Sequence, residues 1–160
     1  MTLHELNTGS EAAVSESLKR CCDSQVWVQR VVALRPFADE SSLLQAADDV
    51  WGSLTRSDWL EAFAQHPKIG QRSASKWSST EQSGMDHASM DTHAAMHQLN
   101  IDYERKFGWI FIVCATGKTA DEMRTLLIER LNNDPTTELA IAAAEQCKIT
   151  KLRVQKLLDE

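Results

Sequence analysis

The sequence predicts an all-α fold, organised as one compact multi-helix domain over residues 1–160. The 160 residues include only 3 prolines and 6 glycines, and these fall mainly between the predicted helices. Apolar residues recur every three or four positions, which is the spacing of one helix face. Residues typical of N-caps precede several of these segments. A chain of this length buries roughly 70% of its unfolded surface, so a single core is sufficient.

Four helices are expected in the first half of the chain, at about residues 11–22, 25–34, 39–54 and 57–65. Pro36 ends the second helix, because a proline disfavours the helical conformation of the residue before it. Ser57 or Thr55 is the expected N-cap of the fourth helix. Trp59 and Phe63 supply large apolar side chains on that helix.

Three further helices are expected in the second half, at about residues 86–107 and 119–132 and from residue 134 onwards. Thr119 and Glu122 have the spacing of a capping box. Asp134 followed by Pro135 places an N-cap before a proline at the first helical position. The apolar run Trp109–Ala115 is too short for a helix of its own and predicts a buried extended connector.

The composition excludes several classes of partner. The net charge is −6 and the sequence has no run of Lys or Arg, so nucleic acid is not expected as a partner. No apolar stretch approaches the ~20 residues of a membrane span. The four cysteines form no CxxC pair, which is typical of reduced thiols in a cytosolic protein. With neither a signal-peptide pattern nor a peroxisomal C-terminal signal, a cytoplasmic location in a bacterial cell is expected.

One loop-rich stretch concentrates polar groups between two predicted helices. It begins with His66-Pro67-Lys68-Ile69-Gly70 and continues into the serine-rich residues 73–83. Pro67 favours an extended His66, so the imidazole should lie at a helix end. Gly70 allows a tight turn. A loop held between helices can direct such groups towards a small substrate, so an ordered active-site segment is predicted here.

Several motifs in the chain, taken in order, resemble those of one enzyme family. The motifs are Arg35-Pro36-Phe37, His66-Pro67-x-Ile69-Gly70, Ser78-x-x-Glu81-Gln82-x-Gly84, Asn100-x-x-Tyr103-x-x-x-Phe107-Gly108-x-x-Phe111, Gly117-Lys118, Arg130-Leu131, Glu138-Leu139, Ile149 and Leu152-Arg153. Together they resemble the 2-oxo-4-hydroxy-4-carboxy-5-ureidoimidazoline (OHCU) decarboxylases of urate degradation. The similarity covers nearly all of the chain after about residue 30.

This resemblance implies a fold, a reaction and a set of site residues. It implies the all-α OHCU decarboxylase fold, a homodimer, no metal or organic cofactor, and the conversion of OHCU to (S)-allantoin and CO2. It assigns His66 as the catalytic histidine and Glu81 as its carboxylate partner. It assigns substrate binding to Pro67, Ser78, Ser79, Thr80, Glu81, Gln82, Phe111, Ile112, Val113, Cys114, Ala115 and Arg153.

The same residue types suit the chemistry. Decarboxylation without a cofactor needs a substrate that takes up the electron pair itself, and the carboxylate of OHCU lies on a carbon flanked by ring carbonyl and C=N functions. The protein must orient the breaking bond, stabilise the developing charge and deliver a proton to one face. An imidazole exchanges protons near neutral pH. A nearby glutamate would hold its tautomer and favour its charged form. The sequence leaves open whether His66 deprotonates the hydroxyl or protonates the carbanion.

Two other functions remain open at this stage. His93 and His97 are four residues apart on a predicted helix and are the ligand pair of an alternative zinc-dependent hydrolase. A non-catalytic helical interaction module is the second alternative, in which exposed tryptophans bind a partner. Purely structural roles are also available, with Ser78 as an N-cap paired with Glu81, and Arg153 as a solvated helix charge.

Overall fold

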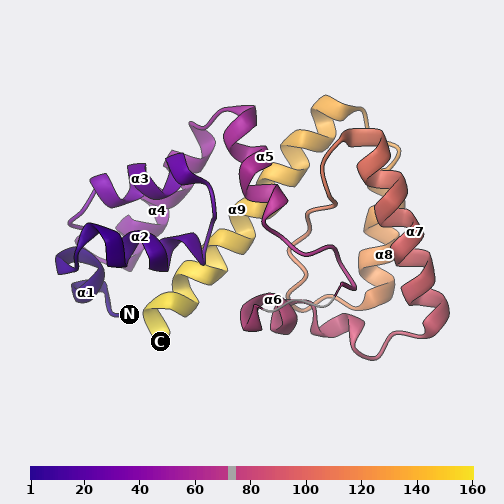
Figure 1. Cartoon of the computed structure of the whole chain (residues 1–160), viewed down its shortest axis with the longest axis horizontal. Helices are drawn as coiled ribbons and strands as arrows, with labels where there is room; N and C mark the ends of the chain where they lie inside the picture. Colours follow the sequence, from indigo (N-terminus) through magenta and orange to yellow (C-terminus); the bar gives the residue numbers. More distant parts are fainter. Residues whose placement is uncertain (72–74) are drawn as a thin grey trace. The chain divides into compact units, whose positions relative to one another are not determined.

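The computed structural model describes residues 1–71 and 75–160, and every regular element in that part of the chain is helical (Figure 1). The predicted all-α fold is therefore confirmed. The helices are α1 (Leu3–Thr8), α2 (Glu11–Lys19), α3 (Gln25–Ala33), α4 (Glu40–Gly52), α5 (Arg56–Ala64), α6 (Lys76–Glu81), the 3₁₀ turn η1 (Ser83–Met85), α7 (Met90–Phe107), α8 (Ala120–Arg130) and α9 (Pro135–Asp159). None of the described helices is both long and apolar enough to cross a membrane.

The described residues form two compact units. The terminal unit consists of residues 1–62 and 147–160, and the central unit of residues 63–146. Helices α5 and α9 contribute residues to both units. Of the predicted polar segment 73–83, residues 73 and 74 lie outside the described residues.

In the terminal unit, α2 packs on α3 and α3 packs on α4. The buried indole of Trp27 fixes one of these contacts, because its Nε1 donates to the carbonyl oxygen of Ala47 at 3.1 Å. Both chain ends lie in this unit (Figure 1). The Met1 ammonium donates to the carbonyl oxygen of Leu157 at 3.0 Å. Helix α1 was not predicted, since its six residues are too few to show a helical period.

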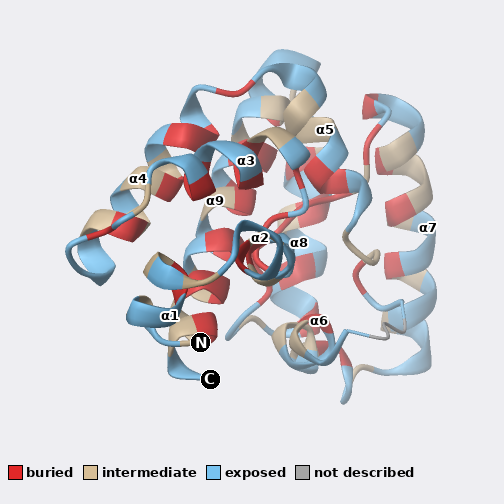
Figure 2. Ribbon diagram, turned by 60° about the vertical axis from the view of Figure 1, so that its left-hand side comes forward, coloured by how far each residue is buried: buried red, intermediate tan, exposed pale blue. Residues whose placement is uncertain are grey.

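In the central unit, α7 packs against α8, and buried residues recur along one side of α7 (Figure 2). The connector Trp109–Ala115 between them contains no helix or strand and, apart from Ile110, is buried, as predicted. Buried hydrogen bonds, including those to Glu138, hold the side chains around this connector. The Glu138 carboxylate accepts from Tyr103 Oη at 2.5 Å and from Arg130 Nε at 2.7 Å. The Trp109 indole donates to Tyr103 Oη at 3.1 Å.

Caps define several helix ends, and two predictions need correction. Thr119 forms the predicted capping box with Glu122, and Thr55 caps α5 through Asp58. Residues 86–89 are not helical, because Met90 begins α7 behind its Ser89 cap. The predicted cap at Ser78 is wrong. Ser75 caps α6 instead, accepting from the Ser78 N–H at 3.3 Å.

Candidate functional site

His66 lies just beyond the C-terminal end of α5, as the sequence predicted. Its N–H donates to the carbonyl oxygen of Phe63 at 3.2 Å, and the chain then leaves the helix at Pro67. The imidazole is half-buried. Its Nε2 lies 2.6 Å from Oε1 of Gln146, a fully buried residue of α9. Both residues belong to the central unit.

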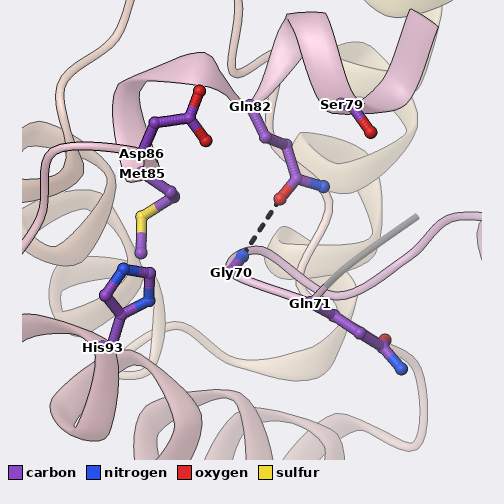
Figure 3. Close-up of a pocket in the computed structure, with 7 residues that line it drawn as sticks. All are labelled: Gly70, Gln71, Ser79, Gln82, Met85, Asp86 and His93. Carbon is purple, nitrogen blue, oxygen red and sulfur yellow. Dashed lines mark hydrogen bonds between the residues drawn. The ribbon is translucent and has the colours of Figure 1, made fainter. Parts of the chain in front are cut away.

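Hydrogen bonds to Gln82 and Asn100 hold the described part of the loop that follows His66. Gly70, at φ +86°, donates its N–H to Oε1 of Gln82 at 3.0 Å (Figure 3). The buried Asn100 of α7 donates its Nδ2 to the carbonyl oxygen of Ile69 at 3.0 Å. The left-handed φ at Gly70 is accessible to glycine at little cost. The His-Pro loop is thus tied to the end of α6 on one side and to α7 on the other.

The predicted residues 78–82 lie on α6 and at its C-terminal end. Ser78 is buried, Ser79 and Thr80 are exposed, and Glu81 is half-buried. The Thr80 hydroxyl donates to the carbonyl oxygen of Lys76 at 2.9 Å. The polar side chains of this short helix are therefore buried to different extents. Gln82, at its end, contacts the His-Pro loop through Gly70.

The predicted residues Phe111–Ala115 are all buried, and side chains from two helices and the following loop hold their backbone. Arg130 donates to the carbonyl oxygen of Ile112 at 2.7 Å. Glu145 accepts the Cys114 N–H at 3.3 Å, and Lys118 donates to the Cys114 carbonyl oxygen at 2.8 Å. Each of these side chains fixes the path of the connector.

Helix α9 links the His-Pro loop with the connector. Its adjacent residues Glu145 and Gln146 contact Cys114 and His66 respectively. The Glu81 carboxylate also affects the pKa of the Cys114 thiol in the connector. Burial raises the pKa of the Cys114 thiol, the Lys118 ammonium opposes this change, and the Glu145 and Glu81 carboxylates add to it. His66, Glu81 and the connector, three predicted parts of the site, all belong to the central unit.

A cavity of about 410 Å³ lies beside this arrangement, between the His-Pro loop, α6 and α7 (Figure 3). Its walls include Gly70, Gln82, Asp86 and His93, while His66 is not among the lining residues. His93 was the first residue of the alternative zinc pair. Among the described residues, no three His, Cys, Asp or Glu side chains come together to hold a metal ion. The zinc hydrolase therefore has no support in the geometry.

Arg153 is the predicted site residue that lies in the terminal unit. It is buried, and its Nη1 donates to the carbonyl oxygen of Arg20 at 3.5 Å. Burial raises the pKa of the Cys21 and Cys22 thiols, and the Arg153 charge opposes this rise. The expected alternative role as a solvated helix charge is wrong for this residue.

None of the five tryptophans, all of which lie within the described residues, is exposed, and Trp77 of α6 is partly buried. Trp27, Trp51 and Trp109 are buried, and Trp59, which is partly buried, donates its indole N–H to the carbonyl oxygen of Trp51 at 3.0 Å. The interaction module that relied on exposed tryptophans is not supported.

Sequence reasoning missed Gln146 and Glu145. The signal that could have found them is a polar pair within an otherwise apolar helix face. Gln146 follows the buried Ala142 by four positions and Ala143 by three. A buried amide or carboxylate requires hydrogen-bond partners, so such a position predicts a specific contact.

Comparison with known proteins identifies relatives over most of the chain. A model of the OHCU decarboxylase family matches residues 7–155. The uric acid degradation bifunctional protein TTL of Arabidopsis thaliana is 37% identical over 89% of this chain and 46% of its own length. The OHCU decarboxylase of Amia calva is 29% identical over 78% of this chain and 75% of its own. The chain thus spans about half the length of the Arabidopsis protein, and 33% of the bifunctional protein PucL of Bacillus subtilis.

Solved structures show the same fold. A crystal structure of an OHCU decarboxylase in the presence of (S)-allantoin is 35% identical and superposes with a TM-score of 0.82, covering 95% of this chain and all of that one. A crystal structure of an (S)-allantoin synthase, 18% identical, superposes with a TM-score of 0.76 over 99% of this chain and 55% of that one. At that identity the second match supports the fold alone.

Proposed function

The chain belongs to the OHCU decarboxylase family, and from this premise we propose that it converts OHCU to (S)-allantoin and CO2 in urate degradation. The observation that carries the proposal is the family match over residues 7–155, which includes the His-Pro loop, α6 and the connector. The gathering of these three segments in the central unit supports the same conclusion.

The substrate supplies its own electron sink. When the C–CO2 bond breaks, its electron pair enters the adjacent ring C=N group. A proton is then added to one face of the carbon that carries the ureido group, and the hydroxyl on the neighbouring carbon becomes the carbonyl of allantoin. Protein groups need only orient that bond, stabilise the developing charge and direct the proton.

His66 and Glu81 are the proposed proton-handling pair. A half-buried imidazole at the end of α5 can exchange a proton with a bound substrate near neutral pH. In the proposed mechanism, the Glu81 carboxylate favours the charged imidazole. Substrate contacts are proposed for Pro67, Ser78, Ser79, Thr80, Gln82, Phe111, Ile112, Val113, Cys114, Ala115 and Arg153. The guanidinium of Arg153 suits the anionic groups of OHCU, since its donors are arranged as a fork.

The proposal includes a homodimer in the cytoplasm. Cys21, Cys22, Cys114 and Cys147 are free thiols, which suits a reducing compartment. Light scattering of the purified protein at several concentrations tests the dimer. A mass of twice 18.0 kDa is expected, and a monomer at every concentration would reject this part of the proposal.

The activity is tested by following the absorbance of freshly generated OHCU with and without the purified protein. Rapid loss of OHCU, unchanged after treatment of the protein with a chelator, is expected. Loss at the spontaneous rate from a folded protein would contradict the proposal, and activity abolished by the chelator would point to a metal enzyme instead.

A further inference from the structure

Gln146 has a contact that its place on a long helix does not explain. Its side chain is fully buried, and its Oε1 lies 2.6 Å from Nε2 of His66. The two residues are 80 positions apart, so the bond joins the His-Pro loop to α9. A buried amide at this distance from an imidazole influences which ring nitrogen carries the proton, as well as where the ring lies.

The contact restricts where the imidazole carries its proton. An amide oxygen accepts hydrogen bonds and cannot donate. A neutral imidazole carries one N–H and one lone pair, and the partner of one nitrogen decides the state of the other. With Oε1 at Nε2, the proton of neutral His66 belongs on Nε2, which leaves the lone pair on Nδ1.

Access favours the same assignment. The Nε2 edge of the ring meets a residue with no exposed surface, whereas His66 itself is half-buried. We infer that Gln146 is a positioning residue that keeps the proton of neutral His66 on Nε2, so that Nδ1 is the nitrogen that exchanges a proton with the substrate. The catalytic part of this inference rests on the proposed decarboxylase function, and the tautomer does not.

The inference separates two roles that the sequence had given to one residue. Sequence reasoning assigned both the tautomer and the charge of the imidazole to Glu81. The structure places Gln146 at Nε2, so Glu81 is left to influence the charge on the ring and the substrate. Gln146 comes from α9, and its amide lies at His66, a residue of the predicted site.

The tautomer is measured by ¹⁵N NMR of the histidine side chains in the wild-type protein, with the His66 signals identified by their loss in His66→Asn. Nε2 is expected to be protonated and Nδ1 to carry the lone pair when the ring is neutral. A neutral His66 protonated on Nδ1 would overturn the inference, whatever the activity.

Variants of Gln146 then test its effect on turnover. Gln146→Met keeps the length of the side chain but removes the acceptor. We expect the persistent Nε2–H signal to disappear. We also expect kcat to fall by about 10-fold or more, which is a smaller loss than the ~10²–10⁴-fold that general acid–base catalysis supplies. KM should change by about twofold or less. Gln146→Glu keeps an oxygen at Nε2 and should retain the Nε2–H signal.

Gln155→Met is the matched control, since Gln155 lies on the same helix and its side chain meets Glu40 at 3.4 Å. It should leave the His66 spectrum and kcat unchanged. A folded Gln146→Met protein with wild-type kcat would overturn the positioning role. If the wild-type protein leaves OHCU to decay spontaneously, the proposed function fails, and the NMR result still decides the tautomer.

Discussion

At the scale of single residues, the proposed chemistry depends on an imidazole whose surroundings come from distant parts of the chain. His66 contacts Gln146 through Nε2, and Cys114 of the connector donates its N–H to Glu145. None of these contacts follows from sequence neighbours. The residue types at the site are therefore visible in the sequence, whereas the partners that adjust them are not.

Replacement of either proposed catalytic residue should remove most of the activity. His66→Gln takes away the group that exchanges the proton, and Glu81→Gln takes away the carboxylate charge with little change of shape. We expect kcat to fall by about 10²–10⁴-fold for His66→Gln, with a smaller loss for Glu81→Gln, measured as the initial rate of OHCU loss.

The exposed His97 provides the control for this pair of variants. His97→Gln should retain wild-type kcat, because the proposed mechanism gives that residue no role. Near-normal turnover by His66→Gln would contradict the assignment of the catalytic histidine.

At the scale of elements, the turn after α6 and the loop before α8 approach each other through a glycine. A Cβ atom at Gly84 would lie 2.0 Å from the Lys118 carbonyl oxygen, which is a backbone atom and cannot move aside like a side chain. This close approach explains why the Ser78–Gly84 motif ends in glycine. It also places η1 beside the loop that follows the connector.

Gly84→Ala should force these two segments apart. We expect a loss of stability of about 1–3 kcal/mol, the usual range for overpacking, together with reduced activity. Gly52→Ala is the control, because Gly52 lies in α4 and a Cβ there meets nothing within 4 Å. That change should leave the stability unchanged or raise it by up to about 1 kcal/mol. Equal urea midpoints for the two variants would refute the close approach.

The buried ion pair of Arg130 and Glu138 should stabilise the folded protein, because Arg130 also holds the backbone of the connector. Their side chains are 8% and 0% exposed, and Arg130 also donates to Ile112. Glu138→Gln leaves the Arg130 charge buried without its carboxylate, so a loss of about 3–5 kcal/mol is expected from chemical unfolding. Glu16→Gln, which removes a partner of the exposed Lys19, should give no comparable loss. A similar, small effect of both changes would show that the buried pair is not stabilising.

Much of the element pattern could be predicted, because capping chemistry and apolar spacing are local. The capping box of Thr119 with Glu122 and the buried, non-helical run Trp109–Ala115 illustrate this. Helices α1 and α6 could not be predicted, since six residues scarcely show a period. Likewise, the Gly84 approach and the Gln146 contact join segments more than 30 residues apart. Local patterns carry no information about such pairs.

At the scale of the whole molecule, stability should fall in alkaline solution. Burial raises the pKa of Cys21 and of Cys22 to about 12, whereas thiols of the unfolded chain ionise near 8.5. Above that pH the unfolded chain binds fewer protons than the folded one, so the free energy of unfolding decreases as pH rises. The contribution is complete below about pH 8.5 and is lost as pH rises towards the folded pKa of about 12.

Urea unfolding under reducing conditions between about pH 8.5 and 10 measures this decrease, expected to be on the order of 1 kcal/mol per pH unit for each thiol. The double variant Cys21→Ala with Cys22→Ala should show a flatter dependence on pH. An unchanged slope in that variant would mean that these thiols are not responsible.

The central claim is that this chain directs the decarboxylation of OHCU to one enantiomer of allantoin through His66. The most direct test is circular dichroism of freshly generated OHCU mixed with the purified protein or with His66→Gln. The wild-type protein should produce the signal of (S)-allantoin well before the spontaneous reaction is complete, and His66→Gln should give only the slow, racemic background. Racemic product formed at the spontaneous rate by folded wild-type protein would contradict the claim.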